Sequence, residues 1–244
     1  MEIFYNKPEN WIALQNKVAY ILNVCGYEVE TPKKISIVKG NVEVDVYAKS
    51  SDLLILCECK YWESKVPQNI IFAFRTICED SGANKGFIIA KEGFQSGAYQ
   101  SIYNTMVKLK TWDEFLELYK ESYLRSNVIR LKRIKSKLFR VADDKSEYWE
   151  YYDVLSKDEQ FEVNKLRANL MEIVLTISQL CIMLQYKENE KIGWDIERVE
   201  EVIIEAEKTF KIQFLSYDDF FEYLNEQIKN IVLEIEKFYK IKIL

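Results

Sequence analysis

The sequence predicts an α/β fold in which a mixed β-sheet is flanked by helices, followed by an all-helical region. In the first half of the chain, short apolar or alternating runs typical of strands interleave with segments of helical spacing. In the second half only helical spacing recurs. The 7 glycines and 3 prolines are few for 244 residues, which disfavours a turn-rich β-sandwich.

The first half contains a regular succession of predicted elements. Asn10 is placed to cap a first helix that ends before Gly26, and Thr111 with Glu114 predicts a capping box for a later helix. The predicted helices span residues 11–24, 67–80, 95–104 and 111–119. The predicted strands span residues 27–31, 42–48, 53–59, 86–90 and 107–109, with 35–38 as an extension of the first strand beyond Pro32.

The division into two domains is predicted at residues 1–124 and 125–244, because everything beyond this point has helical spacing. Two apolar stripes recur at intervals of three and four residues. They pack either within one chain or also across a homodimer, and the pattern leaves both open. The first stripe comprises Val163, Leu166, Leu170, Ile173, Ile177, Leu180 and Leu184; the second comprises Phe220, Phe221, Leu224, Ile228, Ile231, Ile235 and Phe238.

The composition excludes several classes of protein. The chain has no His, which removes Ser-His triads and the usual zinc ligand. Its 5 cysteines are odd in number and lack a disulfide framework, which indicates reduced thiols in the cytoplasm. The first residues lack a signal-peptide pattern and no apolar run approaches the length of a membrane span, so no membrane association is expected.

Charge is unevenly distributed along the chain. The net charge of −5 argues against a surface covered with phosphate-binding residues. Residues 125–140 nevertheless hold seven Lys or Arg and no acid, so Arg130, Lys132 and Arg133 are candidate nucleic-acid contacts. The alternative is a solvated helix neutralised by the acids between residues 143 and 153.

Acidic and basic side chains gather on two neighbouring predicted strands. Side chains two apart share a face of a strand, so Glu43 and Asp45 face together, as do Glu58 and Lys60. A short turn between the strands predicts that they pair as a hairpin. Carboxylates from both strands and the main-chain carbonyl of Cys59 supply the oxygen ligands that Mg²⁺ or Mn²⁺ prefers. Beside such an ion, Lys60 can orient water or neutralise charge on a phosphate.

The spacing Asp-x12-Glu-x-Lys, from Asp45 to Lys60, resembles the PD-(D/E)xK nuclease motif. Flanking segments extend the resemblance to the Mrr-type restriction endonuclease family over roughly residues 10–116, which implies a restriction-endonuclease-like core. The resemblance does not extend to residues 125–244. The segments that carry the resemblance are Cys25-Gly26-Tyr27-Glu28-Val29, Val42-Glu43-Val44-Asp45-Val46, Cys57-Glu58-Cys59-Lys60-Tyr61-Trp62, Val66-Pro67-Gln68, Gly93-Phe94-Gln95-Ser96-Gly97-Ala98 and Thr111-Trp112-Asp113-Glu114-Phe115.

The resemblance also implies roles for individual residues. Asp45 and Glu58 bind the metal and Lys60 is catalytic, while Gln68 fits a supporting polar residue of the active site. Many members of the family carry a Glu on the first helix, where this chain has Gln15. Gln15 therefore either weakens one metal site or acts as a ligand through its carbonyl or through water.

Two further segments are candidate phosphate contacts. Arg75 lies on the helix that follows Lys60, and the alternative is a solvated arginine. Gln95 and Ser96 lie at the start of a predicted helix whose N-terminal amides can bind phosphate. The alternative is a plain loop with a helix cap.

The leading hypothesis from the sequence is a metal-dependent endonuclease that acts on DNA, and the resemblance implies restriction or another anti-phage role. The expected partners are DNA, a second copy of the chain and a protein of a defence system. One alternative is a nucleic-acid-binding or regulatory subunit on a degenerate nuclease fold, which Gln15 motivates. Another is a nuclease that acts on RNA, since the motif does not distinguish the sugar.

Overall fold

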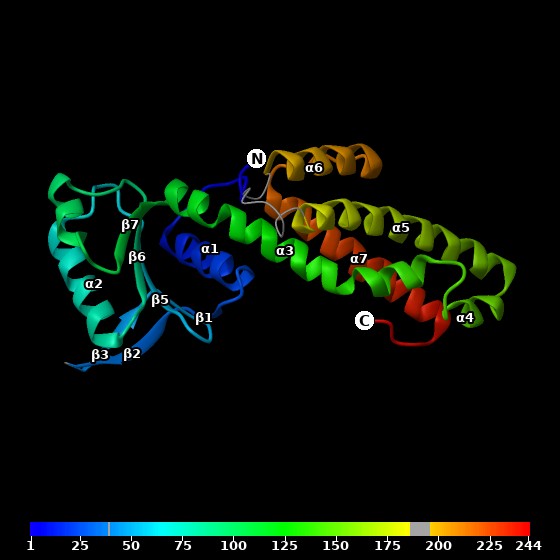
Figure 1. The fold of residues 1–244 in the computed structure, drawn as a ribbon, viewed down its shortest axis with the longest axis horizontal. Coiled ribbons are helices and arrows are strands. Elements are labelled where there is room, and N and C mark those ends of the chain that lie inside the picture. Colours follow the sequence, from blue (N-terminus) through cyan, green and yellow to red (C-terminus); the bar gives the residue numbers. More distant parts are fainter. Residues whose placement is uncertain (39, 186–195) are drawn as a thin grey trace. The chain divides into compact units, whose positions relative to one another are not determined.

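The computed structural model describes residues 1–38, 40–185 and 196–244, which form two compact units (Figure 1). Residues 6–123 form the α/β unit. Residues 1–5 join residues 124–244 in the helical unit, although the sequence places them in the first domain. That the segments 1–124 and 125–244 are domains with separate roles stays a prediction.

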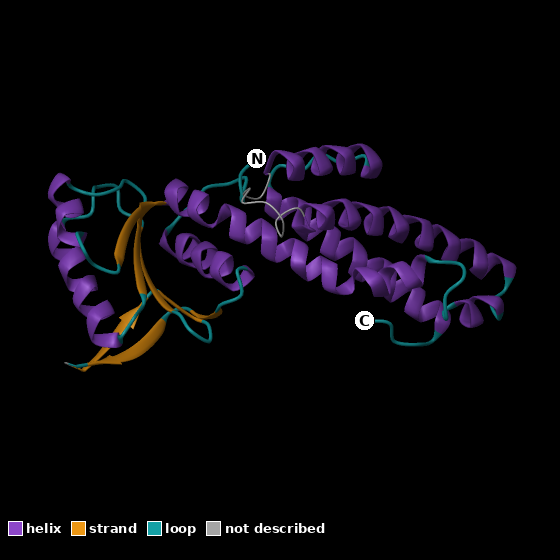
Figure 2. Ribbon diagram, in the orientation of Figure 1, coloured by secondary structure: helices purple, strands orange, loops and turns teal. Residues whose placement is uncertain are grey.

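The α/β unit is built on a five-stranded mixed sheet, which confirms the predicted fold class (Figure 2). Its order is β1-β4-β5-β6-β7. The central strand β5 pairs antiparallel with β4 and parallel with β6, and β6 pairs parallel with β7. The strands are β1 (Glu28–Glu30), β4 (Val46–Lys49), β5 (Leu54–Lys60), β6 (Lys85–Ala90) and β7 (Val107–Thr111).

Helices cover both faces of this sheet, with α1 (Trp11–Val24) and α2 (Gln68–Ser81) on opposite sides (Figure 1). Phe74 of α2 packs in a core with Leu56 and Ile88. On the other face, the Phe87 ring lies 5.8 Å from the ring of Phe115. Because β5 is covered on both sides, its side chains are withdrawn from water along most of its length.

One predicted strand, residues 42–48, is wrong as a single element. The chain bends at Asp45 and divides into β3 (Gly40–Val44) and β4. The extension predicted at 35–38 is also wrong, because β2 (Lys33–Ile37) pairs with β3 in a separate two-stranded sheet. Pro32 lies between β1 and β2, and a residue without an amide hydrogen cannot continue a hydrogen-bonded ladder.

Two predicted helices differ from the structure in type or length. Residues 96–102 form a 3₁₀ helix, η1 (Ser96–Ile102), rather than the predicted α-helix at 95–104, and the early Gly97 disfavours an α-helix here. The helix predicted at 111–119 continues as α3 (Trp112–Ala142) and includes the whole basic run. Its capping box is confirmed, because the Glu114 amide donates to Thr111 Oγ1 at 3.3 Å and the Thr111 amide donates to Glu114 Oε2 at 2.9 Å.

The described part of the helical unit consists of the rest of α3 with α4 (Trp149–Asp153), α5 (Lys157–Gln185), α6 (Ile196–Phe210) and α7 (Tyr217–Tyr239). Both apolar stripes lie mainly inside this unit: Leu170 and Ile177 of α5 are buried, as are Leu224 and Ile235 of α7. The side chain of Leu184 lies outside the described part. Packing within one chain is thus sufficient to explain the stripes, and the homodimer stays a prediction.

Membrane insertion was not expected from the sequence. Across residues 1–38, 40–185 and 196–244, no helix combines the length and the apolar character that crossing a membrane requires.

Gly86 offers a test of how tightly α2 packs on the sheet. A Cβ atom at Gly86 would lie 2.5 Å from Cys78 Sγ and 3.0 Å from Phe74 Cε1. We expect Gly86→Ala to lower the free energy of unfolding by about 1–3 kcal/mol through overpacking. Urea titration measures this change. The matched control is Gly97→Ala, where the atom nearest to the added Cβ, Gln68 Oε1, would lie at 3.7 Å. Equal losses in both variants would contradict the packing argument.

Candidate active site

The hairpin of β4 and β5 places Asp45 beside the end of the central strand. Val46 pairs with Cys57, so Asp45, one residue earlier, stands at the position opposite Glu58. The pairing predicted from the sequence is therefore confirmed. The hydrogen bonding between the two backbones ends here. The Asp45 carboxylate accepts the next hydrogen bond of β5, through Oδ2 from the Cys59 amide at 2.7 Å.

Glu58 and Lys60 lie next to each other on one face of β5, and the Lys60 ammonium donates to Glu58 Oε1 in an ion pair. Their side chains are only 21% and 17% exposed, respectively. Lys60 Nζ also lies 5.4 Å from the centre of the Trp62 ring. Both charges are thus partly withdrawn from water but still open to a ligand.

The electrostatics of the site favour an added cation. Burial raises the pKa of Glu58 and the Asp45 charge raises it further, while the hydrogen bond and charge of Lys60 oppose the rise. Two neighbouring carboxylates therefore have one ammonium between them. A divalent cation would relieve their repulsion.

The main-chain carbonyl of Cys59 faces the same edge as Asp45. The Lys60 carbonyl accepts from the Lys91 amide at 3.0 Å on the β6 side. Because successive carbonyls of a strand alternate in direction, the Cys59 carbonyl points toward the β4 side, as its amide does. The Cys59 thiol is a different matter: burial raises its pKa well above the ordinary value, so it stays protonated.

Across the described residues, no group of three or more His, Cys, Asp or Glu side chains is placed to hold a metal ion. The donors at the end of β5 are instead two carboxylates and one carbonyl. This set fits Mg²⁺, which proteins commonly bind through one or two carboxylates while waters and substrate phosphates complete the shell.

Gln15 reaches the same place from α1, but it binds the backbone. Its side chain is buried, and Nε2 donates to the Asp45 carbonyl at 2.8 Å and to Thr31 Oγ1 at 2.5 Å. Thr31 Oγ1 donates to the same carbonyl at 2.8 Å. A carboxylate has no hydrogen to donate, so a Glu at position 15 could not make these bonds. Gln15 thus fixes the bend at Asp45.

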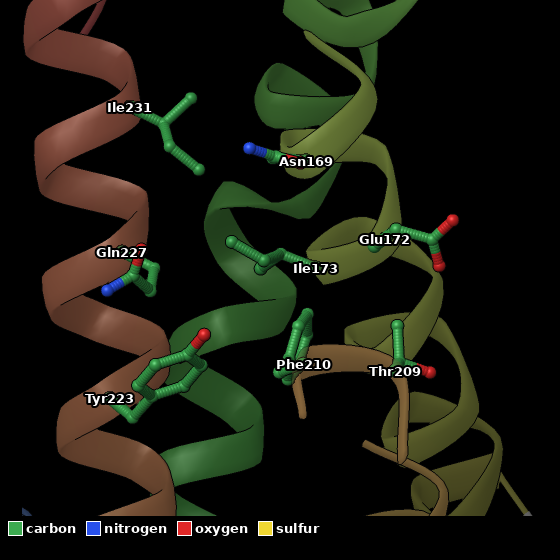
Figure 3. Close-up of a pocket in the computed structure, with 8 residues that line it drawn as sticks. All are labelled: Asn169, Glu172, Ile173, Thr209, Phe210, Tyr223, Gln227 and Ile231. Carbon is green, nitrogen blue, oxygen red and sulfur yellow. The ribbon is translucent and has the colours of Figure 1, made fainter. Parts of the chain in front are cut away.

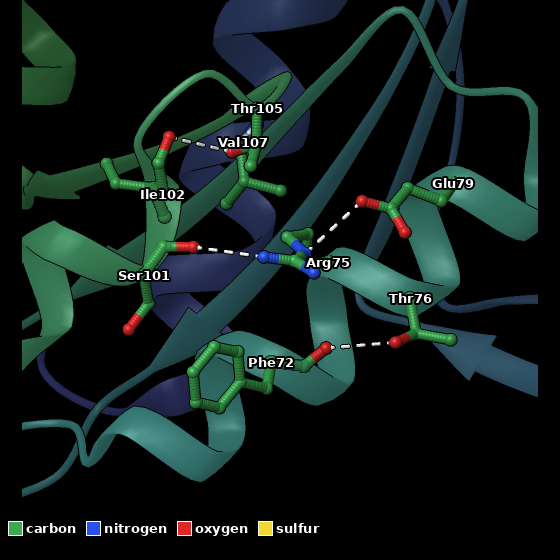
Figure 4. Close-up of polar contacts among 8 residues, drawn as sticks. All are labelled: Phe72, Arg75, Thr76, Glu79, Ser101, Ile102, Thr105 and Val107. Carbon is green, nitrogen blue, oxygen red and sulfur yellow. Dashed lines mark hydrogen bonds and ion pairs between the residues drawn. The ribbon is translucent and has the colours of Figure 1, made fainter.

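Gln68 and Arg75, on α2, are hydrogen-bonded to η1 instead, and Figure 4 shows the bond of Arg75. Gln68 Nε2 donates to Ser101 Oγ at 2.7 Å. Arg75 Nη1 donates to the Ser101 carbonyl at 3.4 Å, and its Nε lies 3.2 Å from Glu79 Oε1 without hydrogen-bond geometry. Within the described residues neither side chain is hydrogen-bonded to Asp45, Glu58 or Lys60, so their roles at the site stay predictions.

The remaining candidate contacts to nucleic acid are exposed. Gln95 and Ser96 stand at the start of η1, which is a short 3₁₀ helix and gives poorer alignment of its amides than an α-helix. Arg130, Lys132 and Arg133 are exposed on α3, and Arg130 Nη2 donates to Asn127 Oδ1 at 2.7 Å. All five contacts stay predictions.

Sequence reasoning missed Thr31 and a hollow beside the site. Thr31 shares the Asp45 carbonyl with Gln15, and no sequence signal marks it. The hollow, of about 350 Å³, lies where β5, β6 and β7 end, and its lining includes Tyr61, Lys91 and Trp112. The carboxyl ends of parallel strands commonly form such crevices, so the predicted strand order could have indicated it.

The fold and the strand-end cluster define a restriction-endonuclease-like nuclease domain. Residues 9–119 match the Mrr_cat family model, which is described as a restriction endonuclease. Over this segment the chain is similar to Mrr-type restriction endonucleases. No curated protein matches the chain.

Solved structures give weaker likenesses. A protein of unknown function, AF1548, is 17% identical with a TM-score of 0.40, covering 68% of this chain and 98% of its own. Can2 from Sulfobacillus thermosulfidooxidans in complex with cyclic tetra-adenylate is 18% identical with a TM-score of 0.38, over 46% and 34%. The DNA modification-dependent restriction endonuclease AspBHI is 12% identical with a TM-score of 0.24, over 52% and 39%. At these TM-scores, the likenesses support no conclusion about this chain.

The role of Gln15 can be tested without measuring activity. We expect Gln15→Leu to lower the free energy of unfolding by about 1–3 kcal/mol, because the Asp45 carbonyl loses one of its two side-chain donors. Gln15→Glu should lose at least as much when EDTA removes divalent ions, since a carboxylate would face that carbonyl. Urea titrations in EDTA measure both. Wild-type stability of Gln15→Glu under these conditions would contradict the positioning role.

Proposed function

We propose that this protein is a Mg²⁺-dependent endonuclease that hydrolyses phosphodiester bonds of DNA. The observation that carries this proposal is the convergence of Asp45, Glu58 and Lys60 at the end of β5. The match of residues 9–119 to a restriction endonuclease model supports DNA as the substrate.

The chain's own groups suit this chemistry. Asp45, Glu58 and the Cys59 carbonyl would hold Mg²⁺ or Mn²⁺, and the bound ion would acidify water and stabilise charge on the phosphate. The hydrogen bond from the Cys59 amide fixes Oδ2 of the Asp45 carboxylate, and it thereby also orients Oδ1. Gln15 holds the backbone of Asp45 in place.

Lys60 is the group that would act on the reacting atoms. Its ammonium carries three donors and no acceptor, so it can hydrogen-bond attacking water or a phosphate oxygen. In the structure, it neutralises Glu58. A cation on Glu58 would take over that neutralisation and free Lys60 to stabilise the negative charge that develops on the phosphate.

The wider biological setting is proposed on the family alone. A role in restriction or anti-phage defence is supported by the description of the matching model. Cleavage of both strands of a duplex favours a homodimer. A partner protein from a defence system and a cytoplasmic location belong to the same proposal.

A second candidate is a nucleic-acid-binding subunit with little or no catalytic activity. The observation that favours it is the use of the Gln15 amide as a donor to the backbone, at a position where the resemblance to the family implies an acid. With only two carboxylates, the site holds a cation less tightly than a site with three. Measurements of metal binding and of cleavage therefore distinguish the active nuclease from the binding subunit.

Replacing Lys60 is the direct test of catalysis. We expect Lys60→Ala to reduce Mg²⁺-dependent cleavage of plasmid DNA by about 100-fold or more, through loss of the donor that stabilises the phosphate charge. The control is Lys65→Ala, which removes an exposed ammonium five residues away. Equal cleavage by Lys60→Ala and the control would contradict the assignment of Lys60 as a catalytic residue. Labelled duplex DNA and RNA assayed side by side show which nucleic acid is cleaved.

Metal binding can be measured separately from cleavage. We expect Mn²⁺ to bind the wild-type protein in calorimetry, and Glu58→Gln to raise the dissociation constant about tenfold or more, because a charged ligand becomes neutral. The matched control is Glu63→Gln, an exposed carboxylate paired with Lys91. Salt-sensitive DNA binding by a wild-type protein that binds no Mn²⁺ would instead support the second candidate.

A further inference from the structure

The helical unit contains a buried arginine without an acidic partner. Arg167 of α5 is only 5% exposed. Its Nε is buried and has no hydrogen-bond partner among the described residues. Within the same residues, no ion pair of Arg167 is present. Because a buried guanidinium is costly unless paired, its position calls for an anion.

Aromatic rings surround the Arg167 guanidinium without supplying an acceptor. Its central carbon lies 5.7 Å from the centre of the Trp149 ring and 5.5 Å from that of Tyr152, both on α4. The Tyr152 hydroxyl already accepts from Asn164 Nδ2 at 2.7 Å. The π faces offset part of the cost of burying the charge, but they leave the planar N–H groups unmatched.

A second buried group without a hydrogen-bond partner interacts electrostatically with Arg167. The Tyr239 hydroxyl of α7 is buried and also has no hydrogen-bond partner in the described part of the chain. Burial raises the pKa of Tyr239, and the Arg167 charge opposes that rise. Three buried side-chain atoms of the described residues lack partners, and two of them are Arg167 Nε and the Tyr239 hydroxyl.

Arg167 also lines an open hollow of about 330 Å³. This volume is within the range of small-molecule sites, about 300–1,000 Å³. Asp143, Asp144 and Asn164 contribute to the same lining. An occupant that suits this lining presents an anion to Arg167 and hydroxyl or amino donors to the carboxylates. A bare polyanion would be repelled by Asp143 and Asp144.

Another hollow of the helical unit, of about 250 Å³, lacks these features (Figure 3). Glu172 is its one charged lining residue, and none of the partnerless buried atoms in the described residues belongs to its lining. Its remaining lining residues are Asn169, Ile173, Thr209, Phe210, Tyr223, Gln227 and Ile231.

We propose that the hollow beside Arg167 binds a small phosphate ester with the chemistry of a nucleotide. The guanidinium fork of Arg167 matches a phosphate group in charge and geometry. The sugar hydroxyls or the amino group of the base donate to Asp143 and Asp144. This site belongs to the helical unit and is independent of the proposed nuclease function.

Adenosine monophosphate is the probe for this site, and adenosine, which lacks the phosphate, is its control. We expect the monophosphate to raise the melting temperature of the full chain at constant ionic strength, and adenosine to leave it unchanged. In calorimetry, Arg167→Gln should raise the dissociation constant for the monophosphate about tenfold or more, since it removes the charged donor. Arg140→Gln, which removes an exposed arginine paired with Glu147, should leave the constant within about twofold.

Arg167→Lys keeps the test decisive if Arg167→Gln does not fold. It keeps the positive charge but loses the guanidinium fork, so the chain should stay folded while the monophosphate binds more weakly. Lys60→Ala should bind the monophosphate as the wild type does. The proposal is overturned if the monophosphate does not bind, if both Arg167→Gln and Arg167→Lys bind it normally, or if Lys60→Ala abolishes binding. A DNA oligonucleotide that displaces it from this site would identify nucleic acid as the source of the phosphate and overturn the small-molecule assignment.

Discussion

The hydrogen bond from the Cys59 amide to the Asp45 carboxylate is the contact on which the candidate active site depends. It lies where the backbone pairing of β4 and β5 stops, so the next amide of β5 donates to a side chain and not to a backbone carbonyl. At Asp45 the chain leaves β3, which belongs to another sheet, and bends into β4. The Asp45 carboxylate thus lies both at the end of the strand pairing and beside Glu58. The geometry of the site therefore depends on the topology of the sheet.

The second constraint on the site is charge. Asp45 and Glu58 repel each other in a partly buried position, and Lys60 compensates for only one of them. A Glu at position 15 would add a third carboxylate, whereas Gln15 supplies a neutral donor that holds the bend. The shape of the site is thus set without a metal ion, and a cation bound there as proposed would be held by two acids. Substrate phosphate oxygens would then contribute much of the remaining coordination.

Features set by local sequence were predictable, and features set by distant contacts were not. The span of α1, the shared face of Glu58 and Lys60, and the capping box at Thr111 follow from short-range periodicity and hydrogen bonding. The bend at Asp45 does not, because alternation continues through residues 42–48 while the donor that fixes the bend lies 30 positions away. Arg167 was missed for a similar reason, since helical spacing does not show what lies opposite a buried charge.

The buried arginine gives the helical unit a thermodynamic property that its apolar stripes alone would not. Burying an unpaired guanidinium and an unpaired phenol opposes folding, and the packing of α5 on α7 must offset that cost. A ligand that pairs with the guanidinium binds the folded state only, so its binding free energy adds to stability. Ala142, the last residue of α3, lines the same hollow. Occupancy would thus stabilise the end of the helix that begins directly after β7, and it would do so through groups that take no part in the nuclease chemistry.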